Sequence, residues 1–293
     1  MKATLNQLIA QGKTLVSDGA WGTFLQAKGL KAGECPELWN IEHASAVLDI
    51  AKSYIAAGAD TIETNSFGGN CFKLEAFGLA DHVYEINYKA AEISRQAAGA
   101  DKYVLGSIGP TGKILMLGDV TEEELYEAFK NQAVALYQGG ADALIIETMT
   151  ALDEASIAVR ACRENTPCEI ICTMTFDRIQ SGEYRTMMGV SPSEMVEELK
   201  AAGVSIVGAN CSNGIEGMID ITREIRLVDD KIPILIHANA GLPILEGSCT
   251  VFPETPEMMA GFATKLADAG ANIIGGCCGT TPEHIKKLVE VLK

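Results

Sequence analysis

The sequence has few basic residues and no long apolar run. Its uninterrupted apolar stretches fall well short of the ~18 residues that a membrane-spanning helix needs. Among 293 residues there are 23 lysines and arginines against 39 acidic residues, which gives a formal net charge of −16. Such a field repels phosphate backbones and anionic membrane surfaces. We therefore expect neither nucleic acid nor a membrane as a partner.

Signals for secretion and for disulfide bonding are also missing. The first residues, MKATLNQLIAQGK, contain no long apolar stretch and no small-residue cleavage site. The nine cysteines are an odd number, and they lie within apolar, strand-like segments. We expect a cytoplasmic, reducing location, with a metal-binding or catalytic use for some of the cysteines.

Short apolar segments with the composition of β-strands alternate with amphipathic helical segments along the whole chain. Alternating strands and helices indicate a parallel sheet, and eight such units favour a closed barrel. The strand-like segments cover residues 14–18, 61–66, 103–108, 143–148, 169–176, 206–211, 234–239 and 273–277. The helical segments include residues 43–57, 121–138, 151–164, 191–202 and 254–269.

Five helical segments end in nearly the same way. The endings are AAGAD at 56–60, AAGAD at 97–101, QGGAD at 138–142, AAGVS at 201–205 and DAGAN at 268–272. In each, we expect the glycine to adopt the left-handed conformation that ends a helix, just before the next strand begins.

The rival architecture is an open, doubly wound sheet. No strand, however, is followed by a GxGxxG or P-loop spacing, and no linker rich in Pro or Ser interrupts the series. We therefore predict an α/β fold, a single (β/α)8 TIM barrel over residues 1–293. Thr4 and Gln7 have the spacing of a capping box, which predicts a short N-terminal helix that closes the bottom of the barrel.

Cysteines stand at the ends of two of the expected strands. In a barrel of this kind the site is built by the loops that follow the strands. The sixth strand ends at Cys211 and the eighth at Cys277 and Cys278, so three thiols converge on one rim. Three sulfurs suit a four-coordinate Zn²⁺ that keeps one position open. The alternative is that these are buried, inert cysteines, above all for Cys211.

Cys277 and Cys278 are neighbours in sequence, and neighbouring residues of a regular strand point to opposite faces. Both can face one ion only if the strand stops there. We expect Gly275, Gly276 and Gly279 to supply that freedom and to remove side-chain bulk around the metal.

The other cysteines and the histidines show no metal-binding pattern. No HxxxH or HExxH spacing is present, and we expect His237 to be a barrel-packing residue. Cys162 lies on an expected helix, while Cys168 and Cys172 lie near the start or middle of a strand. Cys35, Cys71 and Cys249 lie in loops that could approach the site, and their role is left open.

Three rim segments, in this order, resemble the homocysteine S-methyltransferase family. They are GANCS (208–212), NAGLP (239–243) and GGCCGTTPEHI (275–285). The likeness extends over residues 14–285 and is greatest to the homocysteine-binding module of cobalamin-dependent methionine synthases. It implies a zinc enzyme in which Cys211, Cys277 and Cys278 bind Zn²⁺, and in which the homocysteine sulfur takes the open position.

The resemblance also implies how the amino-acid end of homocysteine is bound. Glu147 matches an acidic residue for the ammonium group and Asp18 a second polar contact, although a rim salt bridge or cap is the alternative for each. Backbone N–H groups of Gly19 and Ala20 would receive the carboxylate. Asn239 matches a position beside the metal, where its amide oxygen could fill the open site; otherwise it shapes a turn. The role of Glu63 is left open.

The methyl donor is not determined by these motifs. A D-x-H-x-x-G signature, which marks the cobalamin domain of methionine synthases, is absent. Relatives that use S-methylmethionine often carry Arg after the paired cysteines, whereas this chain has Gly279. The resemblance therefore favours a methylcorrinoid or folate-linked donor over S-methylmethionine. Either the enzyme works alone, or a separate corrinoid protein carries the methyl group.

Two other functions compete with this interpretation. A non-catalytic zinc-thiolate or redox-sensing barrel would need the three thiols but neither Glu147 nor Asp18. A phosphate-binding barrel enzyme such as an aldolase would need a Schiff-base lysine or a phosphate loop near the last two strands, where cysteines stand instead.

Overall fold

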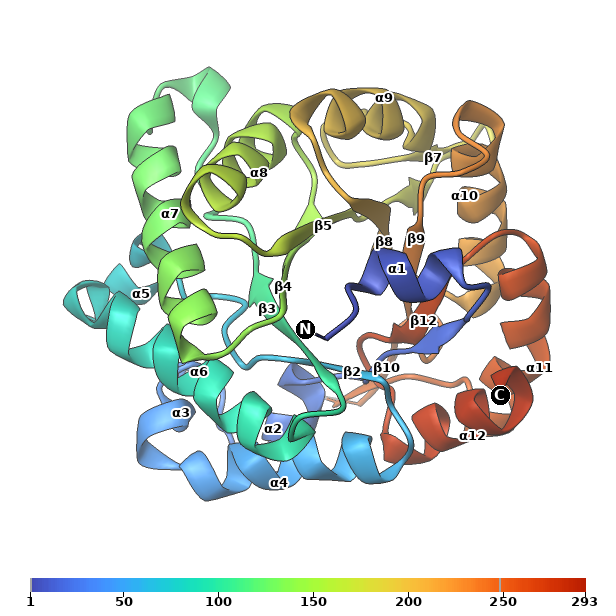
Figure 1. Cartoon of the computed structure of the whole chain (residues 1–293), viewed down its shortest axis with the longest axis horizontal. Helices are drawn as coiled ribbons and strands as arrows, with labels where there is room; N and C mark the ends of the chain where they lie inside the picture. Colours follow the sequence, from blue (N-terminus) through green and yellow to red (C-terminus); the bar gives the residue numbers. More distant parts are fainter. Residues whose placement is uncertain (1, 248) are drawn as a thin grey trace.

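Eight parallel strands surround a common axis in the computed structural model (Figure 1), which describes residues 2–247 and 249–293 apart from the side chains of Glu246 and Cys249. Hydrogen-bonded neighbours follow the order β1–β12–β9–β8–β5–β4–β3–β2. The strands are β1 (Leu15–Val16), β2 (Thr61–Glu63), β3 (Tyr103–Ile108), β4 (Ala143–Met149), β5 (Glu169–Met174), β8 (Ile206–Gly214), β9 (Ile234–Asn239) and β12 (Ile273–Gly276).

The two edge strands of this sheet, β1 and β2, meet through backbone and carboxylate contacts. The Asp60 N–H donates to the Val16 carbonyl at 2.7 Å, and the Val16 N–H donates to the Asp60 carboxylate at 3.0 Å. Closer to the carboxyl ends of the two strands, the Glu63 N–H donates to the Asp18 carboxylate at 3.0 Å. The expected TIM barrel is confirmed, and the open sheet is excluded. That residues 1–293 form one domain stays a prediction.

Helices form the outer ring of Figure 1. The long ones are α4 (Ala44–Ala56), α6 (Val83–Ala98), α7 (Glu122–Gly139), α8 (Leu152–Asn165), α9 (Pro192–Ala202), α10 (Ile215–Val228), α11 (Pro256–Asp268) and α12 (Pro282–Leu292). Short helices α2 (Gly22–Ala27), α3 (Trp39–Glu42) and α5 (Cys71–Glu75), and the 3-10 turns η1 (Ala80–His82) and η2 (Leu115–Leu117), lie in the connections. So do two hairpins, β6 (Asp177–Arg178) with β7 (Tyr184–Arg185) and β10 (Ile244–Glu246) with β11 (Cys249–Val251). No helix among the described residues has both the length and the apolar character to cross a membrane.

The five repeated helix endings all have a glycine of positive φ. Gly140 and Gly203 have the expected left-handed conformation, whereas Gly99, with ψ of −146°, does not. The φ values are 102° at Gly58, 60° at Gly99, 111° at Gly140, 90° at Gly203 and 115° at Gly270. L-residues avoid this region, so these positions stop the helices and return the chain to the sheet.

The barrel interior changes from apolar to polar along its axis. Side chains of alternate strand residues point the same way, so one set fills the lower interior and the set two residues later fills the upper interior. The lower set is a buried cluster that includes Leu15, Leu105, Ile145, Ile171, Leu235 and Ile273. The upper set is also buried and includes Ser17, Ser107, Glu147, Thr173 and His237. A polar floor therefore lies under the carboxyl ends of the strands.

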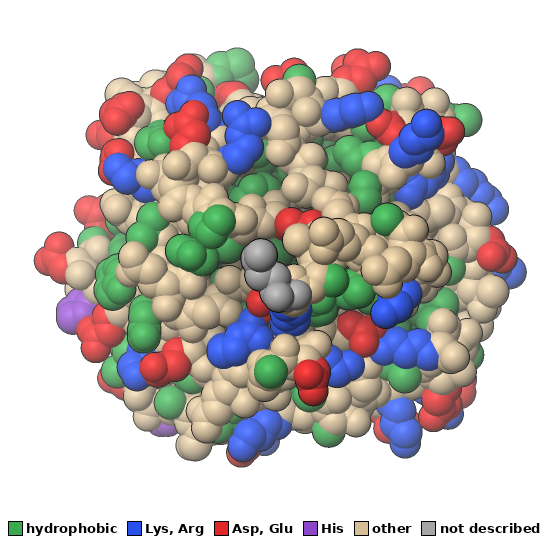
Figure 2. Space-filling model, in the orientation of Figure 1, with side chains coloured by type: hydrophobic (Ala, Val, Ile, Leu, Met, Phe, Trp, Pro, Cys, Tyr) green, Lys and Arg blue, Asp and Glu red, His purple; other side chains and the backbone are tan. Residues whose placement is uncertain are grey.

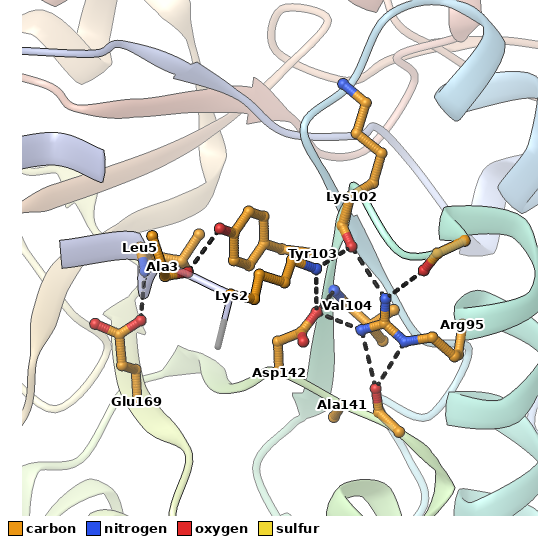
Figure 3. A network of polar contacts seen from close by, with 12 residues as sticks. Lys2, Ala3, Leu5, Arg95, Lys102, Tyr103, Val104, Ala141, Asp142 and Glu169 are labelled. Atoms are coloured by element: carbon orange, nitrogen blue, oxygen red, sulfur yellow. Dashed lines mark hydrogen bonds and ion pairs between the residues drawn. The ribbon is translucent and has the colours of Figure 1, made fainter. Parts of the chain in front are cut away.

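The short N-terminal helix, α1 (Leu5–Ala10), crosses the lower end of the barrel (Figure 1) and begins with the predicted capping box of Thr4 and Gln7. Leu5 belongs to the lower apolar cluster. The Glu169 carboxylate accepts the N–H group of Leu5 at 2.6 Å (Figure 3) and that of Asn6 at 3.1 Å. Figure 2 shows acidic and basic side chains intermingled around the perimeter of this face, with no large patch of one sign.

Two strands end three residues away from the predicted boundary, and the other boundaries differ by two residues or fewer. β2 stops at Glu63 rather than at residue 66, because the hydroxyls of Thr64 and Ser66 hydrogen-bond to each other and to the Ser107 backbone. β8 continues to Gly214 rather than stopping at Cys211, because its register with β9 shifts between Asn210 and Gly214.

Candidate active site

The three thiols come together as expected. The Sγ atoms of Cys211, Cys277 and Cys278 all lie within 4.8 Å of one another, and they are the one such cluster of metal-ligating side chains in the described part of the chain. Tetrahedral coordination with Zn–S bonds of ~2.3 Å would place pairs of sulfurs about 3.8 Å apart, so small side-chain adjustments suffice. The arrangement suits a soft, four-coordinate metal.

The backbone at Cys211 departs from regular strand geometry. Cys211 and Ser212 have φ of 61° and 58°, in the left-handed region that side chains rarely adopt. They lie within the register shift between β8 and β9. A bulge of this kind re-aims a side chain at the edge of a sheet, and such strain is concentrated at functional sites.

Cys277 and Cys278 follow directly after the end of β12 at Gly276. This agrees with the expectation that the strand must stop before two neighbouring side chains can face one ion. The Cys277 N–H donates to the Ala238 carbonyl at 2.7 Å, and the Cys278 carbonyl accepts from the Ala240 N–H at 2.9 Å. Backbone contacts to β9 and the residues after it therefore hold both cysteines.

The glycines around the paired cysteines do not all act as expected. Only Gly279, with φ of 80°, needs the conformational freedom of glycine. A Cβ at Gly276 would lie 2.2 Å from the Thr280 hydroxyl, and one at Gly275 would lie 2.7 Å from Ser17. The space left by these two glycines is thus occupied by neighbouring protein atoms rather than kept clear around a metal.

Within the cluster, the neighbouring thiols shift the pKa of Cys211 in one direction and that of Cys277 in the other. Hydrogen bonds from Cys277 and Cys278 lower the pKa of Cys211, and the Asn239 side chain also donates to its sulfur. The pKa of Cys277 rises through its hydrogen bonds to the other two sulfurs, then through burial and the charges of those sulfurs. The Asn239 Oδ1 atom is buried without a partner among the described residues. A cation at this point would let all three thiols ionise and would give that oxygen a partner.

Above the polar floor lies a cavity of about 270 Å³, into which the three cysteines open. Its apolar wall includes Trp21 and Phe67, and its floor includes Glu63, Glu147 and His237. The described residues that line it include three carboxylates, counting Glu37, but no lysine or arginine. The cavity therefore suits a ligand that carries a positive group as well as a soft atom such as sulfur.

Glu147 reaches this cavity from the end of β4. Its carboxylate accepts a hydrogen bond from the Ser107 hydroxyl and a long one, 3.4 Å, from the Asn210 amide. Burial, and then the nearby Glu63 carboxylate, raise the pKa of Glu147 well above its usual range. A buried acid without a cationic partner is a candidate binding group for an ammonium ion.

Asn210 connects Glu147 to the cysteine strand. Its Oδ1 accepts from the Thr148 N–H at 2.8 Å and from the Thr173 hydroxyl at 2.7 Å, and its Nδ2 donates to the Thr148 hydroxyl at 2.6 Å. Thr148 also has a positive φ, 59°, where the register of β4 with β5 shifts. One buried side chain therefore joins the two irregular strand ends that present Glu147 and Cys211.

Asp18, in the first rim loop, does not have the position that its predicted role in substrate binding requires. Both Asp18 oxygens are used within the protein, by the Ser17 hydroxyl, the Trp21 indole and the Glu63 N–H. Asp18 is buried and is not among the residues that line the cavity. This supports the alternative of a rim contact, and Asp18 acts on the cavity through Trp21 and Glu63.

Gly19 and Ala20 both line the cavity. The Ala20 N–H already donates to the Thr280 hydroxyl at 3.0 Å, so it is not available for a substrate carboxylate. Within the described residues, the Gly19 N–H donates to no acceptor of the protein. Of the two predicted N–H donors, Gly19 is therefore the better placed.

His237 is buried in the barrel interior and lies outside the sulfur cluster, as expected, but it also has a place in the cavity. His237 lines the cavity, and its Nδ1 lies 3.3 Å from the Glu63 Oε1 atom. Glu63, whose role was left open, also faces the cavity rather than the apolar core. The pair joins β2 to β9 across the barrel. The one sequence signal for this contact is that both residues lie close to the carboxyl end of a strand.

The remaining described cysteines stand outside the sulfur cluster. Cys162 and Cys172 are fully buried. Burial and the Glu37 carboxylate raise the pKa of Cys35 to about 11, which keeps it a neutral thiol. Cys71 begins α5, and the Cys249 side chain lies outside the described residues.

Known proteins resemble this chain over nearly its whole length. A family profile described as homocysteine S-methyltransferase matches residues 15–292. The methionine synthases of Mycobacterium tuberculosis and Mycobacterium leprae are 32% and 31% identical to 96% and 98% of the chain. The chain spans about 25% of the length of each of these relatives.

Solved structures share the barrel. The homocysteine methyltransferase MmuM from Escherichia coli, in its metallated form, superposes with a TM-score of 0.77 at 24% identity, covering 96% of this chain and 97% of that one. A methyltransferase from Methanosarcina mazei has a TM-score of 0.64 at 12% identity, covering 99% and 98%. At these identities the structures establish the fold alone.

Proposed function

The chain belongs to the homocysteine S-methyltransferase family, and from that premise we propose that it methylates the sulfur of homocysteine to form methionine. The observation that carries the proposal is the meeting, in one cavity, of three thiols with a buried, uncompensated carboxylate floor. Homocysteine offers a sulfur for the first and an ammonium group for the second.

We propose that Cys211, Cys277 and Cys278 hold Zn²⁺. The donor set fits, because all three ligands are soft sulfurs and the cluster includes no fourth protein ligand among the described residues. The buried Asn239 Oδ1 atom faces no partner, as expected beside a cation. When bound, Zn²⁺ would supply thiolate activation, since a free thiol with a pKa near ~8.5 is mostly protonated at neutral pH.

The amino-acid end of homocysteine would lie on the polar floor. Glu147 would pair with the ammonium group, and the Gly19 N–H would donate to the carboxylate. Trp21 and Phe67 cover the apolar wall and would exclude water from the sulfur. A shielded thiolate keeps its nucleophilicity, because water no longer solvates its charge.

Methyl transfer is then a displacement at carbon. The homocysteine sulfur forms a new bond to the methyl carbon, the bond between that carbon and the donor breaks, and its electron pair leaves with the donor. Gly279 in place of an arginine favours a methylcorrinoid or folate-linked donor, brought by a separate protein, with S-methylmethionine as the alternative.

The test is a donor screen on zinc-loaded protein. Homocysteine is incubated with methylcobalamin, S-methylmethionine or betaine, and methionine is measured. We expect one donor to support turnover, with close to one zinc per chain and with loss of both zinc and turnover in Cys277→Ala. Cys71→Ala, which alters a cysteine outside the sulfur cluster, is the matched control and should keep both.

A second measurement separates this function from a non-catalytic zinc or redox barrel. X-ray absorption at the zinc edge should change from a shell of three sulfurs to one of four when homocysteine is added. An unchanged shell at saturating homocysteine, or full zinc retention in Cys277→Ala, would contradict the proposal.

A further inference from the structure

Two polar atoms on the cavity floor have no hydrogen-bond partner in the described protein. They are the Oε1 atom of Glu63 and the Nε2 atom of His237. Both residues are buried, with 7% and 1% of their surface exposed, and both line the cavity. Buried polar groups are nearly always paired in folded proteins, so two unpaired atoms in one cavity call for an explanation.

Glu63 lies in an unfavourable environment for a carboxylate. Its own N–H is bonded to the Asp18 carboxylate, and Glu147 is close enough for the charge of Glu63 to affect it. The described cavity residues include no lysine or arginine that would balance these acids. The one basic neighbour, His237, has its Nδ1 atom 3.3 Å from Oε1, without the alignment of a hydrogen bond.

Other polar residues of the same layer are satisfied within the protein. Ser107 donates to Glu147, Thr173 donates to Asn210, and Asn210 makes further bonds to Thr148. The protein thus satisfies its structural polar groups at this level. Glu63 and His237 are the exception, which indicates that their partner is a ligand rather than another part of the chain.

We propose that Glu63 is a second carboxylate for the ammonium group of the substrate, acting with Glu147, and that His237 is the positioning residue that holds Glu63. This inference rests on the proposed function. An ammonium group has three N–H donors, whereas both Glu147 oxygens already accept a hydrogen bond. A second carboxylate completes its coordination. The site then selects thiols with an unsubstituted α-amino group.

The test compares two ligands on zinc-loaded protein by calorimetry. Homocysteine has the thiol, the carboxylate and the amine, whereas 4-mercaptobutyrate has the same chain without the amine. Glu63→Gln should weaken homocysteine binding at least about tenfold, as expected for losing one partner of a buried ionic hydrogen bond. Binding of 4-mercaptobutyrate should change less than about twofold, and zinc content should not change.

His237→Gln tests the positioning role. As a single substitution, it should reduce the preference for homocysteine over 4-mercaptobutyrate. Combined with Glu63→Gln in a double variant, it should add little to the effect of Glu63→Gln alone. Such non-additivity is expected when one residue acts through another. If Glu63→Gln does not fold, Glu63→Asp, which keeps the charge but withdraws it, should show the same selective loss.

The outcomes separate the two proposals. Equal losses for both ligands, or no loss for homocysteine, would overturn the role of Glu63 while wild-type binding and turnover still supported the function. Failure of the zinc-loaded wild type to bind homocysteine would instead overturn the proposed function itself.

Discussion

Glu147 lies near the end of β4 with its carboxylate on the cavity floor, where it meets hydrogen-bond donors but no lysine or arginine among the described residues. Glu147→Gln should therefore weaken the binding of homocysteine at least about tenfold, since removing one partner of a buried ion pair typically costs ~2–5 kcal/mol. Binding of 4-mercaptobutyrate should hardly change. Calorimetry on both ligands checks this.

Glu154 provides the matched control. It is also a buried glutamate, but it accepts hydrogen bonds from Thr111 and is not among the residues that line the cavity. Glu154→Gln should leave the preference for the amine intact. A loss of that preference in both variants would show that the effect is general to the fold.

The same Glu147 substitution should stabilise the ligand-free protein. Burial raises the pKa of Glu147 well above the ordinary value of 4.5. The folded state then binds the proton more tightly than the unfolded state, so this residue lowers stability progressively as pH rises above about 4.5. Glutamine cannot ionise and does not have this cost.

We expect the melting temperature of Glu147→Gln to exceed that of the wild type at pH 7, with a difference that shrinks towards pH 5. For a domain of this size, each kcal/mol corresponds to roughly 2–4 °C. Thermal melts from pH 5 to 8 test this. A constant difference across that range would mean that ionisation of Glu147 is not its cause.

At the scale of elements, the two irregular strand ends of β4 and β8 depend on one side chain. Asn210 is fully buried and bonds to Thr148 and Thr173. Asn210→Ala should lower the free energy of unfolding by about 2–4 kcal/mol, because it leaves more than one buried donor unpaired. Thr173→Val removes one of these bonds and should cost only about 1 kcal/mol. Urea unfolding measures both, and equal costs would contradict the bridging role.

The contact between α1 and the lower end of the barrel is a second element-scale feature. The Glu169 carboxylate caps the first turn of α1 through the backbone N–H groups of Leu5 (Figure 3) and Asn6. Glu169→Gln should destabilise this helix locally by roughly 1 kcal/mol, since one N–H would face the amide nitrogen instead of an oxygen.

Hydrogen exchange at the Leu5 and Asn6 amides should accelerate in Glu169→Gln, while exchange in β4 stays slow. Accelerated exchange throughout the sheet would show that α1 is part of the global folding unit rather than a separately opening helix.

At the scale of the whole molecule, the metal site would link distant parts of the chain. Cys211 lies within the bulge of β8, Cys277 and Cys278 follow β12, and β9 lies between these two strands in the sheet. Zinc bound to the folded state should raise stability by ~2.7 kcal/mol at a hundredfold excess over its dissociation constant. A chelator should therefore lower the melting temperature by several degrees, while the far-ultraviolet circular dichroism at 25 °C stays unchanged.

Cys277→Ala should melt at the same temperature with and without chelator. A similar chelator effect in this variant would place the metal elsewhere in the molecule.

The sequence by itself determined the barrel and the place of its cysteines. Alternating segments, the glycine endings from Gly58 to Gly270, and the Thr4 capping box depend on residues within a few positions of one another, so their structure can be predicted locally. Cys211 and the Cys277–Cys278 pair were placed on one rim because the carboxyl ends of parallel strands lie together.

Tertiary structure alone decided how the cavity is built. Asp18 contacts Glu63 across the β1–β2 seam, Asn210 joins two bulges, and Glu63 faces His237 from the opposite side of the barrel. Each of these contacts joins residues more than 40 positions apart, and each depends on strand register, where a shift of one residue turns a side chain to the other face. No local pattern carries that information, because the register is set by the packing of the closed barrel as a whole.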